Sequence, residues 1–195
     1  ASNHFIGRVD EVRLWAWART PDALAGAATR LLNGSELGLA AVWSFDSFAS
    51  ATSVPDGRIP SPPLAPGGFV TTINANPAVF KNGTLASAMV PGVQFSAAPA
   101  SSNSALLFES GSPYPLVSVP DNDEFDLLGS RTIEAWIYPD SGHPNEVRTI
   151  LSKGTGWRLI LGAGNKLLLA LNNGAVNITA SVPVIENRWQ HVAAR

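Results

Sequence analysis

Four acidic side chains stand close together in one short stretch of the sequence: Asp121, Asp123, Glu124 and Asp126. Carboxylate oxygens are preferred ligands of Ca²⁺, which binds about six to eight oxygens. The spacing is not that of an EF-hand loop, whose sixth position requires glycine and whose twelfth requires glutamate. The sequence has Asp126 and Thr132 at these two positions.

This acidic loop has two interpretations. The first is a structural Ca²⁺ site with Asp121, Asp123 and Asp126 as ligands, completed from other loops because one loop supplies too few oxygens. The acidic residues that could supply those oxygens are Asp10, Asp46 and Asp56. The second interpretation is a solvated turn between two strands. We expect no cofactor other than this calcium.

Two glutamates raise the question of glycoside hydrolysis. Retaining glycosidases place two carboxylates about 5 Å apart beside the bound sugar. Glu134 is the only acidic residue in its apolar segment, and no sequence spacing relates it to Glu11. The three histidines, His4, His143 and His191, accompany no G-x-S-x-G nucleophile motif. We therefore predict no catalytic residues and no enzymatic activity.

The segment that carries Glu134, residues 131–139, is the clearest strand in the sequence. Ile133, Ala135 and Ile137 fall on one side, while Trp136 falls on the other. Because both sides are apolar, both should be covered. This pattern predicts a central strand of a two-sheet sandwich.

A second long strand is predicted from Phe5 to Ala18. Its apolar alternation changes phase between Val9 and Val12, which a β-bulge near Asp10 and Glu11 would produce. The alternative is two short strands with a kink.

One helix is predicted, from Thr20 to Asn33. Thr20 can cap its first turn, Pro21 suits the first helical position, and Gly34 suits a left-handed residue after the end. We expect its apolar face to cover an edge or end of the sandwich.

The remaining strands are predicted from short apolar runs. Residues 47–104 are rich in Pro, Gly, Ala and Ser, which predicts long loops with weak strands at 69–73, 78–80 and 93–95. The later part reads as an antiparallel meander with turns at Gly154, at 162–165 and at 172–174. The other expected strands are 40–45, 105–109, 116–119, 147–152, 157–161, 166–171, 176–180 and 188–194.

Composition excludes several classes of function. The 195 residues are 45% hydrophobic and 14% charged with a net charge of −2, which favours a folded chain and gives no basic excess for nucleic acid. No apolar run reaches the roughly 20 residues that membrane insertion by a helix requires. The absence of cysteine excludes disulfides and thiolate zinc sites. Most of the six tryptophans should lie in the core, with one or two facing solvent.

Five sequence motifs carry a family resemblance. Three lie in the later part of the chain: T-I-E-A-W-I-Y-P, I-L-S-K-G and R-W-Q-H-V-A. Two lie earlier: F-I-G-R-V-D-E-V-R-L-W, which starts at Phe5, and G-S-E-L-G-L-A-A-V-W-S-F-D, which starts at Gly34. Together they resemble laminin G-like domains of the concanavalin A-like lectin and glucanase superfamily. In that family the fourth motif closes a domain and the fifth opens the next.

The resemblance implies an all-β fold, a two-sheet antiparallel β-sandwich of jelly-roll, concanavalin A-like type with one short helix. It assigns residues 1–37 to the closing strand and helix of a preceding domain. Residues 38–195 then form a sandwich that is incomplete at its C-terminal end. No catalytic sandwich-glucanase pattern, E-x-D-x-x-E, occurs.

The function that the resemblance implies is a non-catalytic module, extracellular or at the cell surface, that recognises carbohydrate or protein. We expect binding by loops at one end of the sandwich or by its concave face. The alternative function is a structural repeat of a tandem array or surface filament, assembled by strand exchange between copies.

Three arrangements are open for the segment from Phe5 to Ala18. It can fold back into its own sandwich, or it can insert into a neighbouring copy and so drive self-assembly. The third possibility is that the sequence is a fragment of a longer polypeptide. Leaving so apolar a strand in water would be costly, and an open sheet edge invites pairing with another strand.

Overall fold

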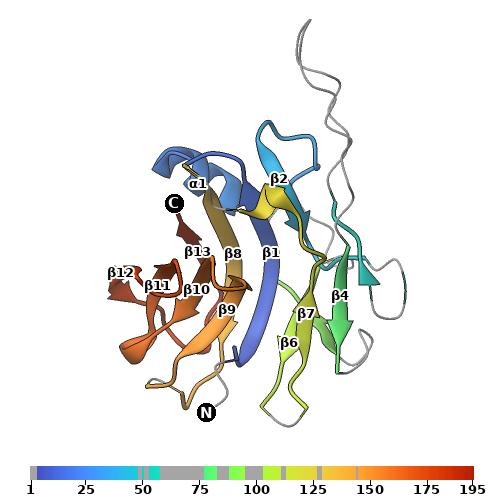
Figure 1. Cartoon of the computed structure of the whole chain (residues 1–195). Helices are drawn as coiled ribbons and strands as arrows, with labels where there is room; N and C mark the ends of the chain where they lie inside the picture. Colours follow the sequence, from blue (N-terminus) through green and yellow to red (C-terminus); the bar gives the residue numbers. More distant parts are fainter. Residues whose placement is uncertain are drawn as a thin grey trace, which may run out of the picture.

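The computed structural model covers the 195-residue chain. It describes residues 4–47, 50, 53–57, 77–82, 88–94, 103–110, 113–126, 129–143 and 145–195, except the Glu124 side chain. The expected strand at 69–73 lies outside the described residues. The described residues form antiparallel sheets and one α-helix (Figure 1), which confirms the predicted all-β sandwich with one short helix.

One layer is a six-stranded sheet. Its strands, in spatial order, are β13 (Gln190–Ala194), β8 (Thr132–Pro139), β1 (Gly7–Trp15), β6 (Ser104–Phe108) and β5 (Met89–Pro91), with β2 (Leu39–Trp43) also paired to β1. The helix α1 (Pro21–Ala28) follows β1.

The six-stranded sheet faces two smaller sheets across the hydrophobic core. The four-stranded sheet has the order β12 (Val176–Pro183), β11 (Lys166–Leu171), β10 (Trp157–Leu161) and β9 (Arg148–Lys153). The three-stranded sheet has the order β3 (Ser53–Val54), β4 (Ala78–Lys81) and β7 (Leu116–Ser118). Short 3-10 turns, η1 (Asp123–Phe125) and η2 (Ala163–Asn165), precede β8 and β11.

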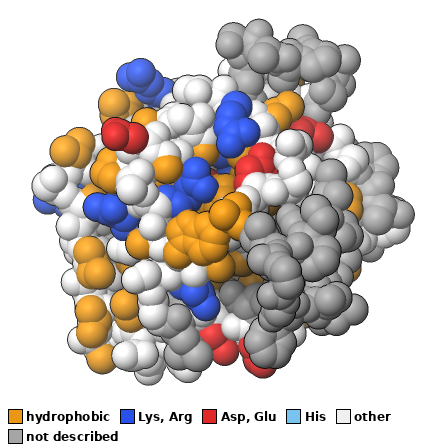
Figure 2. Space-filling view, turned by 90° about the horizontal axis from the view of Figure 1, so that it is seen from above, with side chains coloured by type: hydrophobic (Ala, Val, Ile, Leu, Met, Phe, Trp, Pro, Cys, Tyr) orange, Lys and Arg blue, Asp and Glu red, His pale blue; other side chains and the backbone are white. Residues whose placement is uncertain are grey.

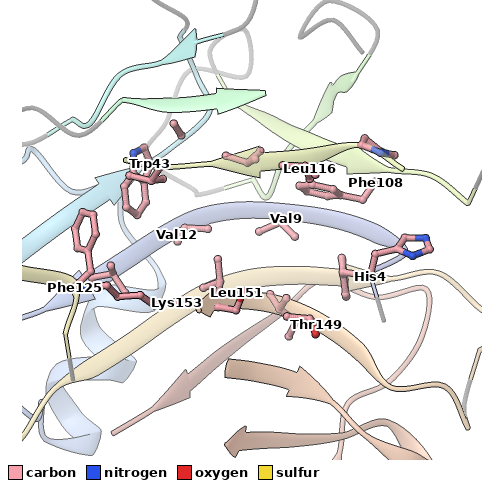
Figure 3. A pocket seen from close by; sticks show the side chains of 18 of the residues that line it. His4, Val9, Val12, Trp43, Phe108, Leu116, Phe125, Thr149, Leu151 and Lys153 are labelled. Atoms are coloured by element: carbon pink, nitrogen blue, oxygen red, sulfur yellow. The ribbon is translucent and has the colours of Figure 1, made fainter. Parts of the chain in front are cut away.

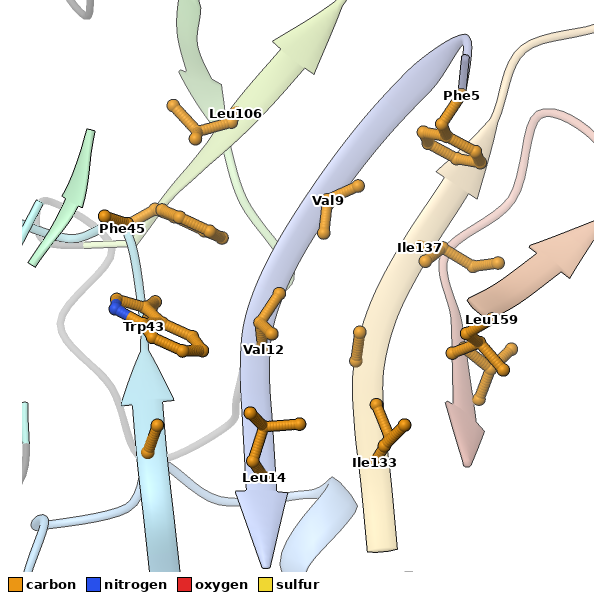
Figure 4. Packing of buried hydrophobic residues seen from close by; sticks show 14 of the residues in the cluster. Phe5, Val9, Val12, Leu14, Trp43, Phe45, Leu106, Ile133, Ile137 and Leu159 are labelled. Atoms are coloured by element: carbon orange, nitrogen blue, oxygen red, sulfur yellow. The ribbon is translucent and has the colours of Figure 1, made fainter. Parts of the chain in front are cut away.

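Strand β1 lies in the middle of the six-stranded sheet. It pairs with β8 on one side, and with β6 and then β2 on the other. The pairing with β8 shifts between Asp10 and Arg13, and Glu11 has a φ of 50°, so the predicted bulge is confirmed. The bulge turns both Val9 and Val12 toward the core (Figure 4).

The chain therefore has the fold-back arrangement of the segment from Phe5 to Ala18. This segment shares one sheet with β2, β6 and β8, all of which belong to residues 38–195. The assignment of residues 1–37 to a preceding domain stays a prediction.

Strand β8 is the central strand that its alternation predicted. Ile133, Ala135 and Ile137 are fully buried in the core between the sheets (Figure 4). On its other face Glu134 is buried, and the Trp136 indole donates to the Ala28 carbonyl over 2.9 Å. Contact with α1 thus covers the outer face, as both-sided apolar character requires.

Helix α1 is shorter than predicted: it ends at Ala28, and the expected extension to Asn33 is wrong. Its start is confirmed, since the Thr20 hydroxyl accepts from the Ala23 N–H over 3.2 Å. At its end, side chains of the sheet take the backbone carbonyls of Ala27, Ala28 and Arg30. These hydrogen bonds from side chains occupy backbone carbonyls that another helical turn would otherwise have to pair.

The predicted meander is confirmed, with β12 extending three residues further than expected. Asn172, Asn173 and Gly174 all have positive φ in its last turn. Val93 and Gln94 form no strand, so the expected strand at 93–95 is wrong at these two residues. The strand observed nearby is β5, which begins four residues earlier. Among the described residues, no helix is long and apolar enough to span a membrane.

Candidate functional site

Glu134 belongs to a buried polar network on the helix-covered face of the six-stranded sheet. Its Oε1 accepts from the Trp15 indole over 2.8 Å, and its Oε2 lies 3.0 Å from His191 Nε2. Burial raises the pKa of its carboxyl, but contacts with His191, Arg13 and Trp15 outweigh burial, so the pKa is lowered. The carboxylate therefore stays ionised at neutral pH.

Glu11 meets the same network through Arg13. Its Oε2 accepts from Arg13 Nη2 over 2.7 Å and from Nε over 3.2 Å. Arg13 Nη1 lies 3.7 Å from Glu134 Oε1. All three side chains are fully buried. Burial raises the pKa of the Glu11 carboxyl, against the opposing attraction of Arg13.

This network cannot act as a glycosidase pair as it stands. Acid–base chemistry on a sugar needs two carboxyls at the wall of a cleft. Glu11 and Glu134 have no solvent access and point at Arg13, which holds the strand β1 and the end of α1 together. In the described structure, this buried network joins β1, β8, β13 and α1.

The acidic loop is held by a lysine. Lys153 Nζ lies 3.1 Å from an Asp121 carboxylate oxygen and also pairs with Asp126. Asp123 is exposed at the start of η1. Because the Lys153 ammonium group already pairs with two of the three carboxylates, a cation bound to both of them would have to displace Lys153. The predicted calcium ligands here stay a prediction.

A second oxygen cluster lies where β1 bulges, around Asp10. Asp10 is fully buried, and its carboxylate accepts from the Glu11 N–H over 2.8 Å and the Val93 N–H over 2.9 Å. Burial raises its pKa to about 8, helped by repulsion from Glu11 and Asp46. Asp46 is half-buried and accepts from the Ser104 N–H over 2.9 Å.

Asn103 completes this cluster. It is 6% exposed, yet neither its amide oxygen nor its amide nitrogen has a hydrogen-bond partner. A Cβ at Gly92 would lie 2.4 Å from Asp10 Oδ2 and 2.6 Å from Asn103 Oδ1, so only glycine allows this approach. Buried amides without a partner are rare, and a bound water or ion is one arrangement that would satisfy this one. Asp56 is buried, and its Oδ1 accepts from the Val42 N–H over 3.2 Å.

The Asp10 cluster fits a hard cation better than the acidic loop does. It offers the carboxyl oxygens of Asp10 and Asp46 and the unpartnered Asn103 amide, and a bound cation would favour the ionised form of Asp10. It has fewer acidic groups than a full carboxylate cage, and within the described residues no three His, Cys, Asp or Glu side chains stand in metal-binding positions.

A cavity of about 540 Å³ opens between β1, β7 and β9 (Figure 3). Its walls are mostly apolar side chains, including Val9, Val12, Trp43, Phe125 and Leu151. His4 stands at one end with both ring nitrogens unpartnered, and Lys153 lies near the other. Apolar walls of this kind suit hydrophobic side chains of a polypeptide better than the hydroxyl groups of a sugar.

The comparison with protein families agrees with this architecture. Residues 110–195, which contain β7 to β13, match the laminin G-type family model described as the Concanavalin A-like lectin/glucanases superfamily. The predicted laminin G-like resemblance is therefore confirmed for this part of the chain. Domains of this type generally bind carbohydrate or protein, are generally non-catalytic and are typically extracellular. Searches of curated proteins and of solved structures found no match.

Sequence reasoning named Asp10 and Asp46 but missed Asn103 and Lys153. Asn103 stands in an Ala- and Ser-rich stretch with no motif around it. Lys153 lies 27 residues after Asp126, so only the docking of β9 beside η1 reveals the pair. The cavity likewise had no local signal, because its walls come from distant segments.

Proposed function

We propose that this chain is an extracellular, non-catalytic laminin G-like module that recognises carbohydrate or protein. Its main support is the laminin G-type match over residues 110–195 in a sandwich whose paired carboxyls, Glu11 and Glu134, are sealed from solvent. Such a sandwich can bind ligands through its loops and faces, whereas these two carboxyls are not accessible to a substrate.

The change Glu134→Gln tests the non-catalytic part of this proposal. We expect no release of reducing sugar from β-glucans by either the wild type or the variant, because no substrate reaches Glu134. The variant should instead unfold at lower temperature, since His191 and Arg13 lose a buried charged partner. Cleavage by the wild type that disappears in Glu134→Gln would contradict the proposal.

The cation that accompanies this function is proposed to be Ca²⁺, held by Asp10, Asp46 and Asn103. We expect Ca²⁺ to raise the thermal midpoint of the chelator-treated wild type, because a ligand that binds only the folded state stabilises it. The change Asp46→Asn should largely abolish that shift. The matched change Asp121→Asn should leave it intact; a loss of the shift in this variant alone would assign the cation to the acidic loop.

The alternative is a structural repeat that assembles by strand pairing, and one observation favours it. Every residue of the edge strand β12 is exposed, including Val176, Ile178 and Val182. In the described sheets, β13 pairs only with β8, and a groove lined by Ile178, Ala193 and Ala194 separates it from β12. Unpaired apolar edges invite added strands.

In such an array, residues 1–37 would close one repeat and residues 38–195 would open the next. Analytical ultracentrifugation distinguishes the two functions. Concentration-dependent assembly that Ile178→Lys removes would favour the structural repeat, whereas a monomer at all concentrations would favour the recognition module.

A further inference from the structure

Trp17 is the one exposed tryptophan of the chain. It is 42% exposed, whereas Trp15, Trp43 and Trp157 are at most 5% exposed, and Trp136 and Trp189 are half-buried. It lies in the turn between β1 and α1, at the end of the sandwich that Figure 2 views from above. An exposed indole presents a flat apolar face on which a sugar ring can stack.

The indole is held in place by the segment that precedes β2. Gly38 has a φ of 80°, and a Cβ there would lie 2.2 Å from the Trp17 ring, so the ring rests directly on the glycine backbone. The Ala16 N–H donates to the Gly38 carbonyl over 2.8 Å, and the Thr132 hydroxyl donates to the Trp17 carbonyl over 3.1 Å. A ring fixed in this way loses little conformational freedom when a ligand binds.

Three arginines surround the same turn. The Arg131 guanidinium donates to the Ala16 carbonyl, and Arg195 Nη1 donates to the Arg19 carbonyl over 3.1 Å. The Arg19 guanidinium lies 3.7 Å from the centre of the Trp15 ring. Figure 2 views this end of the sandwich, where an apolar patch has Lys and Arg side chains on several sides and Asp and Glu side chains nearby.

No carboxylate of the described residues forms an ion pair with Arg19, Arg131 or Arg195. Arg30, in contrast, is paired with Glu36 at 3.4 Å. The positive charges around this turn therefore have no carboxylate partner among the described residues, and the anionic group of a ligand could pair with them.

We propose that Trp17, with Arg19, Arg131 and Arg195, binds an acidic sugar residue of a polysaccharide: the sugar ring stacks on the indole, and its carboxylate or sulfate meets the guanidinium groups. This proposal specifies a ligand class for the recognition function proposed above, and it depends on that function. The face is open rather than enclosed, so it suits one unit within a long chain.

Isothermal titration calorimetry with defined oligosaccharides tests this site. The probes are an oligogalacturonate, which carries carboxylates only, a heparin-derived oligosaccharide, which carries sulfates as well, and neutral maltohexaose. We expect binding of at least one anionic probe and none of maltohexaose. Trp17→Ala and Arg195→Ala should each weaken that binding about tenfold or more, and added salt should weaken it further.

Matched variants control for folding and for unspecific attraction. Trp17→Phe keeps a flat ring and should retain most of the affinity. Tyr114→Ala removes an exposed aromatic ring elsewhere, and Lys166→Ala removes an exposed positive charge on β11; both should bind as the wild type does. A circular dichroism spectrum unchanged in Trp17→Ala confirms that the sandwich is intact.

Four results would overturn the site: no binding of either anionic probe, equal binding by Trp17→Ala, tenfold weakening by Lys166→Ala, or equally tight binding of a single-stranded oligonucleotide. The failure of this site is distinguishable from failure of the recognition function. A glycan that the wild type and Trp17→Ala bind equally well would leave the function standing and place its site elsewhere.

Discussion

Replacing Arg13 with alanine is expected to lower the free energy of unfolding by about 3–5 kcal/mol, the usual loss when one partner of a buried ion pair is removed. Arg13 is fully buried and donates to the carbonyls of Ala27 and Arg30 over 2.8 and 2.9 Å. Its loss would strand the Glu11 carboxylate, whose Oε1 already lacks a hydrogen-bond partner. Equilibrium unfolding in urea measures the change.

The matched control is Arg30→Ala. Arg30 pairs with Glu36 at 3.4 Å, but its side chain is 53% exposed. Exposed pairs contribute about 1 kcal/mol or less, so this variant should stay close to the wild type. If Arg13→Ala costs no more than Arg30→Ala, the buried network does not hold β1 and α1 in the sandwich.

The second large effect is a dependence of stability on pH that comes from Asp10. Burial raises the pKa of its carboxyl from 3.8 to about 8 in the folded chain. Between these values the folded state holds a proton that the unfolded state has released. The contribution of Asp10 to stability is therefore fully present below about pH 4 and is lost as pH rises to about 8, by up to roughly 6 kcal/mol.

Unfolding in urea at several pH values, with a chelator present, measures this slope. Asp10→Asn should flatten it, while the buried or half-buried carboxyls of Glu11 and Asp46, whose pKa values are also raised, keep a smaller slope of the same sign. Identical slopes for Asp10→Asn and the wild type would show that Asp10 is not held in a desolvated site.

Local patterns were enough to predict the strands that build the core. The alternation of Ile133, Ala135 and Ile137 gives β8 its buried face, and the change of phase after Val9 marks the bulge of β1. Period-two alternation can be read from neighbouring residues alone, so it predicts these strands without knowledge of their partners. The family motifs added the sandwich architecture, which alternation alone leaves open.

Contacts between distant residues could not be predicted in the same way. Trp15 meets Glu134 across 119 residues, and the Val93 N–H meets Asp10 across 83. No spacing rule links such pairs, because the fold alone brings them together. The early end of α1 has the same cause: the carbonyls that a longer helix would use are taken by Arg13 and Trp136.

The exposed tryptophan shows where local sequence patterns stop being sufficient and the fold is needed. A count of tryptophans predicts that one or two face solvent, but not which. Trp15 and Trp17 stand two residues apart with similar neighbours, yet Trp15 is buried and Trp17 is exposed. The end of β1 separates them, since Trp15 still lies in the sheet and Trp17 lies beyond it.

The most direct test of the recognition function is a glycan array probed with the wild-type chain in Ca²⁺ buffer. Retention of at least one group of related glycans, with acidic polysaccharides foremost, is the result expected for a laminin G-like recognition module. An array on which no glycan is retained above the signal of an unrelated control protein would contradict carbohydrate recognition and favour the role of a structural repeat.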